Sequence, residues 1–136
     1  IKNDDVKTLQ QFTAKFAGLT RGVEESQITN MALRLAIKNS SMNCLKYMFS
    51  NSSIKGDILR DENRYLAVAW ALENNSSDEI MQLLADNIDL HYEKTVRGGV
   101  VTTGFELAKR WISHSTKLLS DEQKQEAYSK LEELFG

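Results

Sequence analysis

Apolar residues recur at intervals of three and four positions along most of the chain, which is the spacing that gathers side chains on one face of an α-helix. The helices that this pattern predicts lie at about residues 3–18, 28–38, 42–50, 64–73, 77–85, 103–117 and 121–135. In the second of them, the stripe expected to be buried consists of Met31, Ala32, Leu35 and Ala36. The pattern therefore indicates an all-α fold.

Short runs of Asn and Ser separate several of these helices. Residues 39–41 and 75–76 are predicted to form tight turns, because both residue types tolerate turn conformations. Residues 51–56 are predicted to form a longer turn. The helices are thus expected to come in pairs, with a tight turn inside each pair and a longer connection between pairs.

Serine residues are expected to cap three helices, because a serine hydroxyl accepts a hydrogen bond from a free backbone N–H at a helix start. Ser41 is expected to cap the third helix. Ser76 with Glu79, and Ser120 with Gln123, have the spacing of a capping box, in which each side chain bonds to the backbone N–H of the other residue. These serines are expected to fix where the helices begin.

One segment departs from helical spacing. Residues 92–96 and 100–102 favour extended backbone, and they flank Gly98 and Gly99, whose tolerance of positive φ angles suits a tight hairpin turn. A short β-hairpin that projects as a finger is therefore predicted near residues 92–102.

Two stretches of the chain repeat the same order of residue types. AIKNSSMNCLKYMF begins at Ala36, and ALENNSSDEIMQLL begins at Ala71. The matching apolar positions, 35 residues apart, are Leu45 and Ile80, Met48 and Leu83, and Phe49 and Leu84. A period near 35 residues is typical of helical repeats, whose stacked helix pairs share one continuous core.

The repeat resembles the ankyrin family, whose unit reads roughly T-P-L-H-x-A-A, two variable residues, G-H, then I-V-x-x-L-L-x-x-G-A-D-V-N. The apolar positions of that unit are filled by Leu33, Ala36, Leu45, Met48 and Phe49 in one copy and by Val68, Ala71, Ile80, Leu83 and Leu84 in the next. At the end of the second copy, residues 87–90 resemble the G-A-D-V ending of the family unit. Residues 103–108, Thr-Gly-Phe-Glu-Leu-Ala, resemble the opening of a third.

The resemblance implies a solenoid of stacked helix pairs that forms a single domain over residues 1–136. Its expected parts are an N-terminal capping helix or half repeat at 1–27 and three repeats at 28–60, 61–97 and 98–136. No copy keeps the proline or the inner histidine of the family motif. In the third copy, Ala108 lies 26 residues before Leu134, where the other copies have 12, so its first helix or the following loop is expected to be longer.

Composition is that of a soluble globular protein, with 41% hydrophobic and 26% charged residues. The net charge is −2 and both signs are interspersed, so no basic stripe points to nucleic-acid binding. No apolar run approaches the roughly 20 residues of a membrane-spanning helix, and no membrane insertion is expected.

The chain starts at Ile1 and is expected to be cut from a longer protein. One cysteine cannot form an internal disulfide, which favours a cytoplasmic location.

No combination of residues predicts catalysis, a bound cofactor or a metal site. Residues 99–104 have the glycine spacing of a phosphate loop, but Glu106 at the following helix start would repel phosphate. His91 and His114 are expected to lie on the surface, and Cys44 is expected to be a small buried side chain. The chain is therefore predicted not to be an enzyme.

Ankyrin-like proteins bind other proteins through their fingers and inner helices, so the resemblance implies a protein-binding surface. By position in the repeat, its residues here are Lys38, Asn39, Glu62, Asn63, Tyr65, Glu73, Asn74, Thr102, Arg110 and Trp111. Tyr65, Arg110 and Trp111 are expected to contribute most, because aromatic and arginine side chains supply most hot spots. For Trp111 the alternative is packing against the longer segment of the third copy, and Trp70 is expected to be buried.

The leading hypothesis is a monomeric protein-interaction module of a larger protein, and one setting is a bacterial effector that acts in the cytoplasm of a host cell. An alternative is a structural or autoregulatory domain that packs against a catalytic domain of the same polypeptide. A third is an irregular helical bundle with accidental periodicity. A binding experiment with the fragment alone separates the first two.

Overall fold

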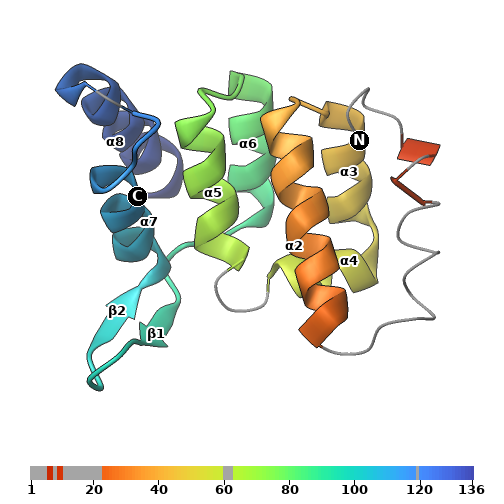
Figure 1. Ribbon diagram of the computed structural model, residues 1–136, viewed down its shortest axis with the longest axis horizontal. Coiled ribbons are helices and arrows are strands. Elements are labelled where there is room, and N and C mark those ends of the chain that lie inside the picture. Colours follow the sequence, from red (N-terminus) through yellow and green to blue (C-terminus); the bar gives the residue numbers. More distant parts are fainter. Residues whose placement is uncertain (1–5, 8, 11–22, 60–62, 119) are drawn as a thin grey trace. The chain divides into compact units, whose positions relative to one another are not determined.

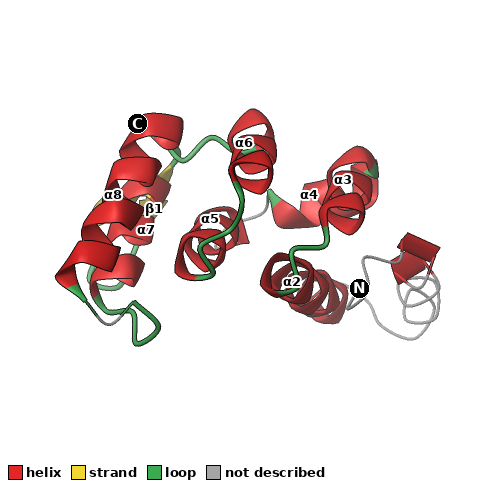
Figure 2. Ribbon diagram, turned by 90° about the horizontal axis from the view of Figure 1, so that it is seen from above, coloured by secondary structure: helices red, strands yellow, loops and turns green. Residues whose placement is uncertain are grey.

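The computed structural model describes residues 6–7, 9–10, 23–59, 63–118 and 120–136. These residues form seven α-helices and a two-stranded antiparallel sheet (Figures 1 and 2). The chain is thus mainly helical, as its periodicity predicts, although the helix predicted at 3–18 lies largely outside the described residues. By its internal contacts the chain divides into two compact units, residues 1–63 and 64–136.

The first unit contains α2 (Val23–Lys38), α3 (Met42–Ser50) and α4 (Ser52–Ile58), which pack against one another. α2 and α3 form the first of the predicted helix pairs, and the two helices run antiparallel (Figure 1). The buried side chains of these helices include Leu33, Ala36, Ile37, Cys44, Leu45, Met48, Phe49 and Ile58. The burial of Cys44 confirms the prediction made for it.

The stripe predicted on α2 is wrong at two of its four positions. Met31 is 60% exposed and Leu35 is 44% exposed, while Leu33 and Ile37 are buried in their place. α2 carries apolar residues on more than one face, and periodicity alone does not decide which face meets α3 and α4.

The prediction of a turn at residues 51–56 is also wrong, because this segment opens helix α4. The Oδ1 atom of Asn51 accepts hydrogen bonds from the backbone N–H groups of Ser53 and Ile54, both at 3.1 Å, and so caps the helix. Ile58 lies one turn after Ile54 and is fully buried. A cap at one end and a buried anchor at the other therefore hold this short helix in place.

The second unit contains α5 (Asn63–Glu73, from Arg64 onward), α6 (Asp78–Asn87), β1 (Glu93–Thr95), β2 (Val101–Thr103), α7 (Gly104–Ser113) and α8 (Asp121–Phe135). α5 and α6 form the second of the predicted helix pairs and also run antiparallel (Figure 1). α8 packs against both α6 and α7. The largest fully buried side chains are Ile80, Met81, Leu84, Leu90, Ile112 and Leu131. Trp70 on α5 is buried as predicted, with 7% of its surface exposed.

The turns inside the two helix pairs have the same geometry. Ser40 and Asn75, which lie 35 positions apart, adopt positive φ angles of 52° and 51°. In each turn the next residue donates its backbone N–H to the carbonyl five positions earlier, at 2.8 Å for Ser41 and 3.0 Å for Ser76. These features define a Schellman motif, which ends a helix and satisfies its last carbonyl groups. Both predicted tight turns are confirmed.

The same motif explains why two of the predicted serine capping bonds are not formed. Both serines are buried in the turn that ends the preceding helix. Ser41 stands at the N-cap position of α3, as predicted, but its side chain makes no capping hydrogen bond, and Ser76 is not the cap of α6. The cap of α6 is Ser77, whose Oγ atom accepts a hydrogen bond from the backbone N–H of Ile80 at 3.4 Å. The Oγ atom of Ser76 has no hydrogen-bond partner in the described part of the chain.

Replacing Ser77 by Ala is expected to lower the free energy of unfolding by about 0.5–1 kcal/mol, because the substitution removes the cap of α6. Replacing Ser76 by Ala is expected to leave that free energy unchanged or to raise it by up to about 1 kcal/mol, because it removes a buried hydroxyl that lacks a partner. Urea unfolding followed by circular dichroism compares the two variants. A greater loss at Ser76 than at Ser77 would reverse the assignment of the cap.

In the third copy, the first helix or the following loop is predicted to be longer, and the additional residues lie after α7. This helix ends at Ser113, short of the predicted 117, and a connecting segment at 114–120 leads into α8, which has 15 residues. The capping box of α8 is confirmed. Gln123 donates its backbone N–H to the Ser120 hydroxyl at 3.1 Å, and Ser120 donates its own to Oε1 of Gln123 at 3.2 Å. The following loop and a longer second helix thus accommodate the difference.

The predicted hairpin is confirmed. β1 and β2 pair antiparallel with Lys94 opposite Thr102, and in Figure 1 the hairpin extends away from the helices of its unit. Gly98 and Gly99 in the connecting turn have φ angles of 87° and 76°, which glycine adopts without strain.

The hairpin leads directly into α7 at Gly104. Thr103 caps this helix, since its Oγ1 atom accepts a hydrogen bond from the backbone N–H of Glu106 at 3.2 Å. A Cβ atom on residue 104 would overlap the ring of Tyr92. The guanidinium group of Arg64 also lies over that ring, 4.4 Å from its centroid. A side chain at position 104 would therefore displace a ring that also contacts Arg64.

Replacing Gly104 by Ala is expected to lower the free energy of unfolding by about 1–3 kcal/mol, because the Tyr92 ring must move. In a Tyr92→Ala background the same substitution should cost far less, since Ala favours the helix more than Gly does and no ring then opposes it. Chemical unfolding of the four proteins of this double-mutant cycle gives the coupling energy. Equal costs in both backgrounds would show that the overlap with Tyr92 is not the cause.

Candidate functional site

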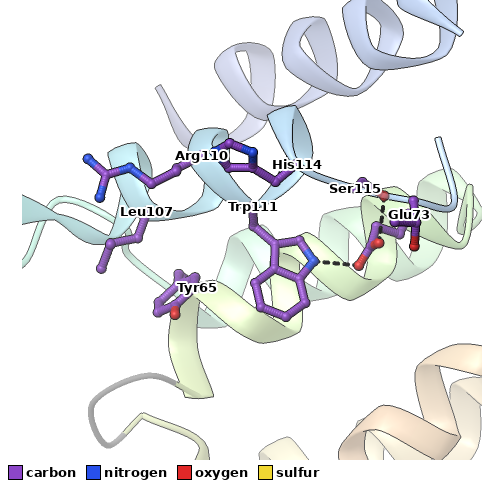
Figure 3. Close-up of a pocket in the computed structure, with 8 residues that line it drawn as sticks. Tyr65, Glu73, Leu107, Arg110, Trp111, His114 and Ser115 are labelled. Carbon is purple, nitrogen blue, oxygen red and sulfur yellow. Dashed lines mark hydrogen bonds between the residues drawn. The ribbon is translucent and has the colours of Figure 1, made fainter. Parts of the chain in front are cut away.

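A pocket of about 360 Å³ opens on the second unit between α5, α7 and the segment that follows α7 (Figure 3). Its lining residues are Tyr65, Glu73, Leu107, Arg110, Trp111, His114, Ser115 and Thr116. A second hollow of about 150 Å³ lies between α5, the segment before α8, and α8 itself, and it shares Glu73 with the first.

Helical spacing brings these side chains onto the walls of the pocket. Tyr65 and Glu73 are separated by about two turns of α5 and so share one face of it. On α7, Arg110 and Trp111 lie three and four positions after Leu107, which places both of them beside it on the helix surface. Most of the pocket therefore rests on regular helices, which hold side chains in more fixed positions than loops do.

The carboxylate of Glu73 is fixed at one end of the pocket by two neutral donors. The indole N–H of Trp111 donates a hydrogen bond to Oε1, and the hydroxyl of Ser115 donates one to Oε2 at 2.7 Å (Figure 3). The Ser115 oxygen in turn accepts hydrogen bonds from the backbone N–H groups of Lys117 and Leu118, at 3.2 and 3.3 Å. Glu73 thus links α5, α7 and the start of the connecting segment.

The rings of the pocket remain partly open to solvent. Trp111 is 37% exposed, and Tyr65 and Leu107 are half-buried. In Figure 3, the Tyr65 and Trp111 side chains lie beside each other, while Arg110 extends away from Glu73. Arg110 and His114 are exposed and so form the charged or titratable rim of an otherwise largely apolar hollow.

Four of the residues assigned to a binding surface from the sequence come together in this pocket, namely Tyr65, Glu73, Arg110 and Trp111. Trp111 lines the pocket together with Ser115 and Thr116 of the segment after α7, and 37% of its surface is exposed.

The other assigned residues whose side chains the structure describes do not line the pocket. Asn74 is exposed in the turn after α5, and Thr102 is half-buried in β2. In the first unit, Lys38 and Asn39 are exposed at the end of α2, where the Asn39 side chain donates to the carbonyl oxygen of Leu35 at 3.0 Å. Glu62 lies outside the described residues, and Asn63 is described only as the first residue of α5.

The other four lining residues, Leu107, His114, Ser115 and Thr116, were not assigned to a binding surface from the sequence. The spacing from Leu107 to His114 on one helix face was a usable signal, but nothing in the sequence indicated that Ser115 would reach Glu73. His114 is exposed, as predicted, at the end of α7. His91 is exposed as predicted, and its ring stacks on Phe105 with centroids 5.8 Å apart.

In the described part of the chain, His, Cys, Asp and Glu side chains form no group of three or more that could hold a metal ion. None of the described helices is long and apolar enough to cross a membrane. Comparison with protein-family models, curated proteins and solved structures finds no match to this chain. The geometry of the pocket is therefore the basis for inferring function.

Proposed function

We propose that this chain is a protein-interaction module with an ankyrin-like repeat fold, and that it binds a partner protein through the pocket between α5 and α7. The observation that carries the proposal is the pair of partly exposed rings, Tyr65 and Trp111, at a surface hollow. Aromatic side chains in such hollows are typical of interface hot spots, because a partner that covers them removes a large apolar area from water.

Two features support the ankyrin-like fold. Helix pairs closed by the same Schellman turn recur after 35 residues, with Ser40 and Asn75 at the equivalent position of positive φ. A projecting hairpin also precedes α7, where the resemblance implies a finger. Repeats of this kind need neighbours to bury their apolar faces, which suits a chain built from short helix pairs.

The size of the pocket is sufficient for one side chain of a protein partner. Its volume of about 360 Å³ lies near the lower end of the roughly 300–1,000 Å³ found for small-molecule sites. A hollow of this size suits one anchoring side chain, with the exposed rim residues Arg110 and His114 available to the neighbouring residues of the partner.

The proposed partner is another protein or another domain of the parent chain, and the proposed location is the cytoplasm, including that of a host cell if the parent protein is a bacterial effector. The sequence contains one cysteine, Cys44, which is buried, and a chain that does not depend on an internal disulfide suits a reducing compartment.

The test is a selection of displayed random peptides on the full chain, followed by titration of an enriched peptide. In a Trp70→Phe background the fluorescence comes from Trp111 alone, and we expect it to change saturably as the peptide binds. The matched control is Trp111→Phe, in which only the buried Trp70 emits and little change is expected. Failure to enrich any peptide, or binding without a change at Trp111, would contradict the proposal.

A further inference from the structure

We infer that the anchor received by this pocket is a lysine or arginine side chain of the partner, held over the Tyr65 and Trp111 rings with its charge directed to Glu73. The inference rests on the proposed function, since it names the chemistry of the partner at the same site. Three properties of the pocket carry it: its ring faces, its uncompensated carboxylate and the arrangement of charge at its rim.

The faces of aromatic rings attract cations, and tryptophan and tyrosine do so more strongly than phenylalanine. The described residues of the second unit already form such pairs. The Arg64 guanidinium lies 4.4 Å from the centroid of Tyr92, and the Lys109 ammonium lies 5.6 Å from that of Phe105. In the pocket, the partly exposed Trp111 ring lies beside Tyr65, and a basic side chain is the group that would use both faces (Figure 3).

Glu73 supplies a full negative charge that the described residues do not neutralise. Both of its hydrogen-bond donors, the Trp111 indole and the Ser115 hydroxyl, are neutral, and no ion pair joins it to a cation in the described part of the chain. A carboxylate has about four acceptor sites, so two remain for the N–H groups of a ligand. The two bonds fix the carboxylate before any ligand arrives, which lowers the entropy lost on binding.

The alternatives for the anchor fit this charge less well. An acidic side chain would be repelled by Glu73. A purely apolar side chain would cover the carboxylate without offering it a hydrogen bond, and burying such a charge is costly. Arg110 extends away from Glu73 (Figure 3), and Lys117 and Lys130, which line the second hollow together with Glu73, make no ion pair with it in the described part of the chain. Arg110 is instead available to an acidic residue that flanks the basic anchor.

The first test uses peptides enriched by selection on the full chain. We expect Lys or Arg to be fixed at one position, and replacing it by norleucine to weaken binding about tenfold or more, equivalent to about 1.4 kcal/mol. Glu73→Gln should have a similar effect and should reduce the salt dependence of binding. Glu126→Gln makes the same charge change at the exposed α8 residue of the second hollow and should leave binding unchanged.

The second test uses small probes that need no peptide. The indole N–H resonance of Trp111, assigned by its loss in Trp111→Phe, should shift saturably with n-butylammonium or n-butylguanidinium and much less with 1-butanol. Glu73→Gln should remove that difference between charged and neutral probes. Equal shifts with all three probes in the unmodified chain would overturn the inference.

These outcomes separate the inference from the proposed function. Enriched peptides that lack a basic residue, yet still change the Trp111 fluorescence, would overturn the basic anchor and leave the interaction module intact. Enriched peptides that bind without affecting Trp111 would overturn both. A Glu73→Gln chain that binds as tightly as the unmodified chain, with the same salt dependence, would overturn the role given to the carboxylate.

Discussion

Replacing Leu84 by Ala is expected to lower the free energy of unfolding by about 2–5 kcal/mol, the largest effect on stability that we predict. Leu84 on α6 is fully buried, so truncation removes apolar contacts and leaves a cavity that the neighbouring helices fill only in part. A small domain has only about 5–15 kcal/mol of stability in total. The loss is therefore expected to be visible as a large shift of the urea midpoint.

Leu83→Ala is the matched control, because it makes the same chemical change on the same helix. The repeat pattern predicts both leucines in the core, but Leu83 is only half-buried. Its truncation should cost clearly less than that of Leu84, because less apolar area returns to water. Equal costs, or a greater loss at Leu83, would contradict the packing of α6 described above.

Replacing both Tyr65 and Trp111 by Ala is expected to weaken partner binding by about 2 kcal/mol or more, because desolvated aromatic anchors carry costs of this size. The affinity is measured by calorimetry with an enriched peptide. Thermal unfolding should change little, since both rings are partly exposed and neither belongs to the fully buried core.

Two conservative variants refine this prediction. Tyr65→Phe keeps the ring and should retain most of the affinity, whereas Trp111→Phe keeps an apolar ring but removes the N–H that orients Glu73 and should lose part of it. If the double Ala variant binds normally, the pocket is not the interface. If it unfolds instead, the two rings belong to the core.

Much of the helical architecture could be predicted from the sequence because long amphipathic helices leave a strong periodic signal. α3 has the predicted bounds, and the hairpin follows from two adjacent glycines. α4 could not be recognised in this way. It has seven residues, includes two serines and a glycine, and depends on the Asn51 cap and on the burial of Ile58.

The absence of capping bonds from Ser41 and Ser76 has a different cause. Local rules assign a cap to any serine ahead of a helix, but Ser41 and Ser76 are taken up by the turn that closes the preceding helix. The choice between Ser76 and Ser77 depends on the positive φ angle at Asn75, which the composition of the turn does not specify. A shift of one residue then decides which hydroxyl is buried.

Several residues of the candidate site could be predicted from the sequence, but the contacts between them could not. Position in the repeat assigned Tyr65, Glu73 and Trp111 to a common surface, but it did not indicate that Trp111 would donate a hydrogen bond to Glu73. That contact joins residues 38 positions apart. The bond from Ser115 to Glu73 also requires α7 to end at Ser113, four residues before its predicted end.

The most direct test of the central claim is amide chemical-shift mapping of an enriched peptide on the isotope-labelled full chain. If the pocket between α5 and α7 binds the partner, the largest shifts should fall at residues 65–73 and 107–116, together with the indole N–H of Trp111. Shifts confined to the first unit or to α8, with these segments unchanged, would contradict the proposed site.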